Sequence, residues 1–327
     1  MKLEEIGFYT MCDARAAQAS GTSSLWRCEL VLGARCNFHC PYCRSIGGKD
    51  LPFKQAVETV RLWASHGLRN IRFSGGEPTL FPYLADLCQL ARDLGIQRIA
   101  ISTNGSAPTA MYGRLLEAGV NDASVSLDAC CAEDGDNMAG GIKGAFDVIV
   151  ENIRWLAAHI YTTVGVVLTP DNLDTVNDII RFADSLGVAD IRIIPASQDG
   201  DRLSDVRVDN MLLDKYPILR YRIRNLQAGR TVRGLHSHDP NRCPLTLDDM
   251  AVNQGKHFPC IIYMRESGNP IGAVGPNMRS EREAWFEAHD THSDPICRSN
   301  CLDVCIDYNR TFFASNARAW LVHESPL

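Results

Sequence analysis

The sequence predicts an α/β protein, built as an incomplete barrel of six β/α units and followed by a small cysteine-rich domain. Short apolar runs rich in β-branched residues alternate six times with longer runs of helical spacing. Such alternation is typical of parallel βαβ units, but six units are fewer than the eight of a closed barrel. After Leu235 glycine and proline become more frequent, and five cysteines gather there.

The predicted elements follow one another in strand–helix pairs. Several helical runs stop at a glycine, such as Gly95, Gly119 and Gly187. The predicted strands cover residues 28–33, 70–73, 98–102, 122–127, 163–168 and 190–194. The predicted helices cover residues 54–66, 80–94, 111–118, 145–158, 173–186 and 211–226. The predicted domains are an N-terminal extension over 1–25, the barrel over 26–230 and the C-terminal domain over 231–327.

Length and composition are ordinary for a globular protein. The chain has 327 residues, of which 45% are hydrophobic and 22% are charged, and its formal net charge is −6. This charge predicts no general basic field for nucleic acid, although a local basic patch is compatible with it. We expect no signal peptide, because the N-terminus, Met1-Lys2-Leu3-Glu4-Glu5, lacks a basic region followed by an apolar core. We expect no membrane helix, because no apolar stretch reaches roughly 18 residues. A cytoplasmic protein is therefore expected.

The thirteen cysteines cluster, which favours metal sites in a reducing compartment over a disulfide framework. Cys36, Cys40 and Cys43 follow the first predicted strand in one tight loop, so their thiolates can point at one centre. Thiolates suit an iron–sulfur cluster or zinc. A four-iron cluster on three cysteines leaves one iron open to a small molecule, whereas structural sites are closed. A zinc knuckle with His39 as a fourth ligand is the alternative.

Cys36-x3-Cys40-x2-Cys43, with the aromatic Tyr42 before the last cysteine, resembles the signature of the radical S-adenosylmethionine (SAM) superfamily. The resemblance implies a partial TIM-type barrel and a catalytic [4Fe–4S] cluster on these three cysteines. It implies that the open iron binds the amino and carboxylate groups of SAM, and that an electron cleaves SAM to methionine and a 5′-deoxyadenosyl radical. By the same resemblance, Tyr42 lies near the adenine.

Polar residues follow the second, third and fourth predicted strands. In parallel barrels, catalytic and binding residues lie at these C-terminal ends of the strands. Each alone is a common turn former, but their register with the cysteine loop favours a ligand site. Residues 74–78 resemble the GGEP motif that contacts the amino group of SAM, and the others resemble segments that meet its ribose and carboxylate. The SAM-binding residues so implied are Gly75, Gly76, Glu77, Ser102, Asn104, Ser126 and Asp128. Cys130 and Cys131 are interpreted as ordinary loop thiols.

The C-terminal part holds a second set of cysteines: Cys243, Cys260, Cys297, Cys301 and Cys305. A hairpin turning at Gly255 would bring the first two together, and the spacing of the last three suits one face of a helical turn. The Cys-x11-Gly-x4-Cys opening resembles the SPASM or twitch extensions, which bind auxiliary [4Fe–4S] clusters. The full SPASM pattern has seven cysteines, so the resemblance implies one auxiliary cluster on four of these five. A structural zinc ribbon is the alternative.

The resemblance as a whole implies a radical SAM enzyme of oxidoreductase or isomerase type. It would abstract hydrogen from a small molecule or peptide between the barrel mouth and the C-terminal domain, leading to oxidation, epimerisation or rearrangement. A flavodoxin or ferredoxin would supply electrons. Two alternatives stand beside this hypothesis: a radical SAM enzyme that modifies nucleosides or nucleic acid, and a non-catalytic iron–sulfur or zinc binding module.

Overall fold

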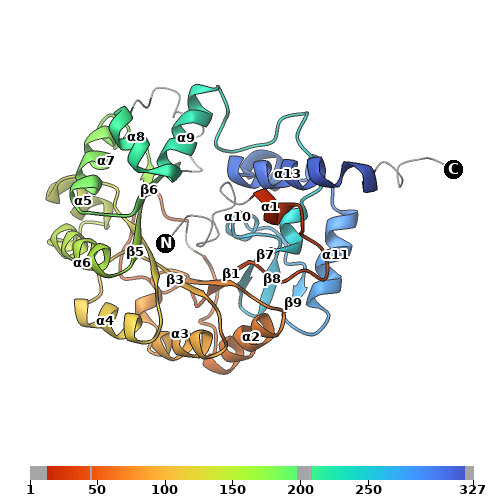
Figure 1. Ribbon diagram of the computed structural model, residues 1–327. Helices are drawn as coiled ribbons and strands as arrows, with labels where there is room; N and C mark the ends of the chain where they lie inside the picture. Colours follow the sequence, from red (N-terminus) through yellow and green to blue (C-terminus); the bar gives the residue numbers. More distant parts are fainter. Residues whose placement is uncertain (1–12, 45, 197–205, 207, 321–327) are drawn as a thin grey trace.

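The barrel part of the sheet contains six parallel strands in the predicted order. The computed structural model describes residues 13–44, 46–196, 206 and 208–320. Each strand from β1 to β6 pairs in parallel with the next one along the chain, which confirms the predicted α/β fold. Figure 1 shows these strands curling around an interior. Their bounds are β1 Arg27–Val31, β2 Asn70–Ser74, β3 Arg98–Thr103, β4 Asp122–Ser126, β5 Tyr161–Leu168 and β6 Asp190–Pro195.

The helices between these strands cover the outer face of the sheet (Figure 1). In α7, Val176, Ile179, Ile180 and Ala183 recur at helical spacing and are buried, which is why this segment forms a helix with one apolar face. The helix bounds are α2 Phe53–Ser65, α3 Leu84–Asp93, α4 Thr109–Glu117, α6 Ala145–His159 and α7 Val176–Ser185. A single 3-10 turn, η3 (Pro78–Leu80), precedes α3.

The predicted helix over residues 211–226 is in fact two helices, α8 (Asn210–Lys215) and α9 (Pro217–Gln227). The proline that begins α9 causes the break, because its ring keeps the preceding residue out of helical backbone. Tyr216 accordingly has φ −113° and ψ 95°. A further helix, α5 (Ala132–Met138), lies between β4 and α6, where the sequence predicted none.

The C-terminal part continues the barrel sheet beyond β1. β7 (Asp249–Asn253) pairs in parallel with β1, and β8 (Lys256–Phe258) and β9 (Gly272–Ala273) follow in antiparallel order. The predicted hairpin turn is confirmed, since Gln254 and Gly255 have φ of 50° and 71°, as a two-residue turn between strands requires. The resulting nine-stranded sheet is open, with β6 at one edge and β9 at the other.

Helices are more numerous after Leu235 than the sequence predicted. They are α10 Ile261–Arg265, α11 Met278–Ala288, α12 Pro295–Asn300 and α13 Asp303–Trp320. The short α1 (Asp13–Ala16), inside the predicted N-terminal extension, contacts α13 and shares a small apolar cluster with Tyr308 and Phe312. Residues 1–12 of that extension lie outside the described residues. Within the described ranges, no helix combines the length and the apolar character needed to cross a lipid bilayer.

The two faces of the barrel strands differ in chemistry. On β2, Ile71 and Phe73 are buried in the core beneath the helices, whereas Arg72 between them lines the interior. Charged residues on neighbouring strands also pair with each other. Arg98 on β3 donates through Nε to the Asp122 carboxylate on β4 at 2.8 Å and through Nη2 to the same oxygen, and both side chains are almost inaccessible.

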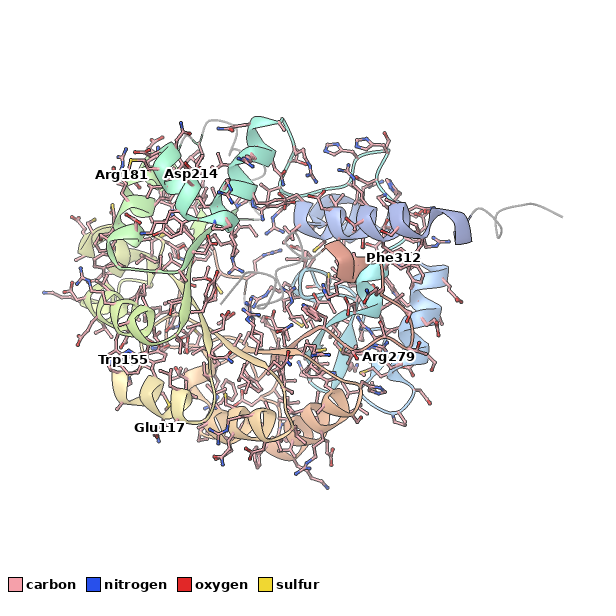
Figure 2. All side chains as sticks on the ribbon, in the orientation of Figure 1. Glu117, Trp155, Arg181, Asp214, Arg279 and Phe312 are labelled. Carbon is pink, nitrogen blue, oxygen red and sulfur yellow. The ribbon has the colours of Figure 1, made fainter. Side chains whose placement is uncertain are left out.

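We predict that Arg98→Met strongly destabilises the fold, because it leaves the Asp122 carboxylate buried without its partner. The expected loss in free energy of unfolding is about 3–5 kcal/mol, measured by urea unfolding. Arg181→Met is the matched control. Arg181 lies on the outer helix α7 (Figure 2), and its exposed pair with Asp178 should contribute less than about 1 kcal/mol. Equal stability of the two variants would contradict this account.

Candidate functional site

Three thiols of the first loop face one cavity. Cys36, Cys40 and Cys43 follow β1 and line a cavity of about 210 Å³, together with residues from the ends of β2, β3 and β4. Burial, together with the negative charges of Asp128, Cys43 and Cys36, raises the pKa of Cys40 to about 11. Thiolates that repel one another are stabilised by a cation between them. The donor set therefore fits an iron–sulfur cluster, whose usual protein ligands are cysteine thiolates.

The glycines after β2 hold the cysteine loop in place. The N–H of Gly76 donates to the Gly33 carbonyl at 2.9 Å, and the N–H of Glu77 donates to the Arg35 carbonyl at 2.8 Å. A Cβ on Gly76 would lie 2.2 Å from the Arg35 carbonyl oxygen, so a larger residue cannot be accommodated without moving the loop. Gly75 has φ 147°, which other residues rarely adopt. Both glycines also line the cavity.

Glu77 lies behind the cavity wall. Its buried carboxylate accepts hydrogen bonds from the Thr79 N–H at 3.1 Å, the Thr79 hydroxyl at 2.7 Å, the Thr103 hydroxyl at 2.8 Å and the Asn104 N–H at 2.7 Å. Burial raises the pKa of Glu77, while the bonds from Asn104, Thr79 and Thr103 lower it. The described residues that line the cavity do not include Glu77. Its carboxylate instead joins the ends of β2 and β3.

Five further residues implied by the resemblance line the same cavity: Tyr42, Ser102, Asn104, Ser126 and Asp128. The Tyr42 hydroxyl donates to the Asp128 carboxylate, whose other oxygen accepts from the Val167 N–H at 2.6 Å. Burial raises the pKa of Asp128 to about 6, against the lowering effect of these two bonds. The Asn104 amide donates to Asn37 in the cysteine loop at 3.0 Å. Hydrogen bonds therefore connect the polar strand ends to one another and to that loop.

The structure adds wall residues that the sequence analysis missed. Met138 from α5 and Phe146 and Ile149 from α6 provide apolar surface. Arg192 from β6 and Arg265 from α10 provide positive charge. The alternation of side chains along β6 is the one signal that could have placed Arg192 in the interior. No comparable signal marks the apolar residues, because their role depends on how α5 and α6 pack.

Other candidate ligands lie away from this cavity. His39 is exposed and is not among the described lining residues, so the structure gives no support to a zinc knuckle that includes it. Cys130 and Cys131 also lie outside the lining. Cys131 is exposed and donates to the Asp134 carboxylate at 3.1 Å, as a loop thiol does.

A second, larger cavity of about 370 Å³ adjoins the first. The two cavities share the wall residues Tyr42, Cys43, Ser102, Arg192 and Arg265. They are therefore neighbouring parts of one interior space. The volume of the larger cavity is within the range of sites that hold small molecules.

The five C-terminal cysteines also face one space. They line a small cavity of about 30 Å³. Burial raises the pKa of all five thiols, to about 12 for Cys260, and the charges of neighbouring cysteines add to the rise for Cys260, Cys297, Cys301 and Cys305. Cys260 and Cys305 line the larger cavity as well. This donor set, too, fits an iron–sulfur cluster.

The prediction that the last three cysteines share one helical face is wrong. Cys297 lies in α12, Cys305 lies in α13, and Cys301 between them has φ −58° and ψ 130°, which is not helical. Two short segments rather than one helix therefore bring these thiols together. Cys297 also forms a group with His289 and Asp294, whose ligand atoms lie within 4.8 Å of one another and could hold a single metal ion.

Comparisons with known proteins agree with the predicted fold and superfamily. Residues 30–183 match the model of the radical SAM superfamily. A probable GTP 3′,8-cyclase of Sulfurisphaera tokodaii is 28% identical over 49% of this chain and 52% of its own length. The GTP 3′,8-cyclase of Pseudomonas fluorescens is 30% identical over 46% of this chain and 47% of its own length. The chain thus spans about half the length of the curated relatives it matches.

A solved structure shares the fold over most of the chain. The crystal structure of Streptococcus suis SuiB bound to the precursor peptide SuiA is similar over 88% of this chain and 69% of SuiB, with a TM-score of 0.61 and 14% identity. A radical SAM domain implies a [4Fe–4S] cluster and SAM as its cofactors. Residues 30–183 are a radical SAM domain, and the superfamily indicated by Cys36, Cys40 and Cys43 is confirmed.

Proposed function

We propose that the protein is an enzyme that cleaves SAM beside Cys36, Cys40 and Cys43 and abstracts hydrogen from a substrate in the adjoining larger cavity. One observation carries this proposal: the three thiols and the ends of β2, β3 and β4 line the same cavity. A reduced [4Fe–4S] cluster on the thiols would supply one electron, which cleaves SAM to methionine and a 5′-deoxyadenosyl radical. This chemistry would abstract a hydrogen atom from the substrate and leave 5′-deoxyadenosine as the product.

The chain's own residues would bind SAM and exclude water. Gly75 and Gly76 present backbone to the cavity, and Ser102, Asn104, Ser126 and Asp128 present polar groups. The apolar surfaces of Met138, Phe146 and Ile149 would keep water from a reactive radical. Glu77 acts as a positioning residue, because its carboxylate fixes the backbone of Asn104 and does not line the cavity.

The five C-terminal cysteines are proposed to hold an auxiliary [4Fe–4S] cluster on four of their thiols. Two observations support this role: all five line one cavity, and Cys260 and Cys305 also line the larger cavity. A cluster there would border the substrate and could exchange an electron with a substrate radical. A structural zinc site is the competing proposal, because Cys297 lies beside His289 and Asp294.

The substrate is proposed to be a small molecule or a peptide, as the size of the larger cavity suggests. Both classes occur among similar proteins: the relatives are named for a reaction of GTP, and SuiB is seen with a precursor peptide. The overall reaction would be an oxidation, an epimerisation or a rearrangement. A small redox protein such as flavodoxin or ferredoxin would supply electrons, and the cytoplasm is the expected location.

The first test is the product of SAM cleavage. Anaerobically reconstituted protein should bind about eight irons per chain, which corresponds to two clusters, and should release 5′-deoxyadenosine from SAM and dithionite. Replacing Cys36, Cys40 and Cys43 together by alanine should leave about four irons and stop nucleoside release, because one cluster is lost. Cys131→Ala, which changes an exposed loop thiol, is the control and should alter neither quantity.

Two results would contradict the proposal. If the triple variant keeps all of its iron, the first cysteine loop holds no cluster. If the unmodified protein releases no 5′-deoxyadenosine under any reducing condition, the barrel is a binding module rather than an enzyme.

Glu77→Gln tests the positioning role. The carboxylate accepts the Thr79 N–H on one oxygen and the Asn104 N–H on the other, so either orientation of an amide sets an NH2 group against a backbone donor. We expect a loss of about 1–3 kcal/mol in the free energy of unfolding, together with weaker SAM binding. The control is Glu117→Gln on the outer helix α4 (Figure 2), where the side chain is exposed. Equal stability of the two variants would show that Glu77 does not hold the strand ends.

Single alanine replacements of the five C-terminal cysteines test the auxiliary site. Four of the five variants should lose up to about four irons each, and the fifth should keep the full iron content, because a [4Fe–4S] cluster takes four thiolates. Iron and zinc are measured together by mass spectrometry. Zinc in place of this iron in the unmodified protein would favour the zinc ribbon and rule out the auxiliary cluster.

A further inference from the structure

The larger cavity is rich in arginine. Among the described residues, its wall contains two carboxylates, Glu29 and Asp249, and seven arginines: Arg27, Arg44, Arg72, Arg192, Arg222, Arg233 and Arg265. Arg72 on β2 and Arg192 on β6 occupy inward positions of the barrel strands. Arg233 follows α9, and Arg265 ends α10. These last four arginines thus come from four separate segments of the chain and contribute guanidinium groups to one space of about 370 Å³.

Three of these arginines have a carboxylate partner. The pairs are Arg27 with Asp249 at 2.8 Å, Arg44 with Glu266, and Arg222 with Asp303. Asp249, one of the two carboxylates of the wall, is therefore already paired with Arg27. The other, on Glu29, accepts the Ser74 hydroxyl at 2.6 Å, and its charge acts on both Arg72 and Arg192.

The other four arginines, Arg72, Arg192, Arg233 and Arg265, form no salt bridge with any residue that the structure describes. The Nε atoms of Arg72, Arg192 and Arg233 are buried and have no hydrogen-bond partner in that part of the chain. Within the described ranges, Arg192 donates only from Nη2 to the Ser124 hydroxyl, at 3.3 Å. The charges of Glu29 and Asp122 act on Arg72 and Arg192, and the charge of Glu266 acts on Arg233. None of these carboxylates forms a salt bridge with the four arginines, so the guanidinium groups have no direct anionic partner among the described residues.

Such an arrangement is costly for a protein that binds nothing there. Burial, with repulsion from Arg98, lowers the pKa of Arg72 to about 10, and burial also lowers the pKa values of Arg192 and Arg233. A guanidinium group stays protonated at neutral pH in proteins, so all three side chains are charged. Uncompensated charge in a buried space is unfavourable, and an anion that enters the space removes this cost.

We propose that the larger cavity binds phosphate groups, so that the substrate is a phosphorylated small molecule with at least two negative charges. This inference rests on the proposed function, because the cavity is a substrate site only if SAM is cleaved beside it. A planar guanidinium group can donate two parallel hydrogen bonds to two oxygens of one phosphate. Arg72 and Arg233 line only the larger cavity, whereas Arg192 and Arg265 line both. Arg72 and Arg233 are therefore the phosphate ligands, and Arg192 and Arg265 lie between substrate and SAM.

Binding of pyrophosphate to the reconstituted full-length protein tests this proposal. Isothermal titration calorimetry at constant ionic strength would compare pyrophosphate with citrate, which is a carboxylate probe of similar charge. We expect the protein to bind pyrophosphate more tightly than citrate. Arg72→Gln and Arg233→Gln should each weaken pyrophosphate binding by about tenfold to hundredfold. Arg72→Lys should bind pyrophosphate more tightly than Arg72→Gln but less tightly than the unmodified protein, because lysine restores the charge without the two parallel hydrogen bonds.

Arg181→Gln, on the outer face of α7, is the matched control and should bind pyrophosphate as the unmodified protein does. Iron content and circular dichroism show whether each variant is folded. The two glutamine variants change separate segments of the chain, so one still tests the site if the other fails to fold. Tighter binding of citrate would overturn the assignment to phosphate. Unchanged pyrophosphate affinity in both folded glutamine variants would overturn the assigned site.

The unmodified protein separates this inference from the proposed function. Release of 5′-deoxyadenosine without any pyrophosphate binding would refute the phosphate site and support the proposed radical SAM activity. Pyrophosphate binding without release of 5′-deoxyadenosine would refute the proposed activity. The cavity would then bind anions, but it would not be a substrate site of a radical SAM enzyme.

Discussion

The parallel direction of the six barrel strands is the constraint on which the site depends. Parallel strands end at one edge of the sheet, so residues far apart in the sequence come to face the same space. The cysteine loop after β1 thereby meets Asn104 after β3 and Asp128 after β4. Short hydrogen-bonded contacts then fix these segments to one another. The buried carboxylate of Glu77 joins β2 to β3, and the backbone of Gly76 joins the end of β2 to the cysteine loop.

A second consequence of the strand geometry is the separation of charge. Successive side chains of a strand point to opposite faces, so apolar residues pack against the helices while polar ones line the interior. The chain is acidic overall, with a net charge of −6, yet the described wall of its larger cavity is rich in arginine. Net charge sums over the whole chain, so it says little about what one interior space binds.

Much of the fold could be predicted from the sequence because its signals are local. Apolar strands, helices that end at glycine, and the hairpin turn at Gly255 depend on neighbouring residues. The break before Pro217 is local as well, and the strong helical pattern on both sides concealed it. The arrangement of Cys297, Cys301 and Cys305 was mispredicted, because cysteine spacing alone does not reveal the non-helical residue at Cys301.

The arginine-lined cavity could not be predicted, because it depends on pairing between distant residues. Arg27 finds its carboxylate 222 positions away, and Arg222 finds its own 81 positions away. Which arginines are left without a partner therefore becomes visible only when the barrel and the C-terminal part are both folded. The same holds for the apolar wall from α5 and α6.

The central claim is that three thiolates hold a cluster whose fourth iron binds SAM. Electron–nuclear double resonance on the reduced protein, with SAM labelled with ¹⁵N at its amino group, tests it most directly. The account predicts a ¹⁵N coupling to the cluster that disappears when Cys36, Cys40 and Cys43 are replaced by alanine. A cluster that shows no such coupling in the unmodified protein, with SAM demonstrably bound, would contradict it.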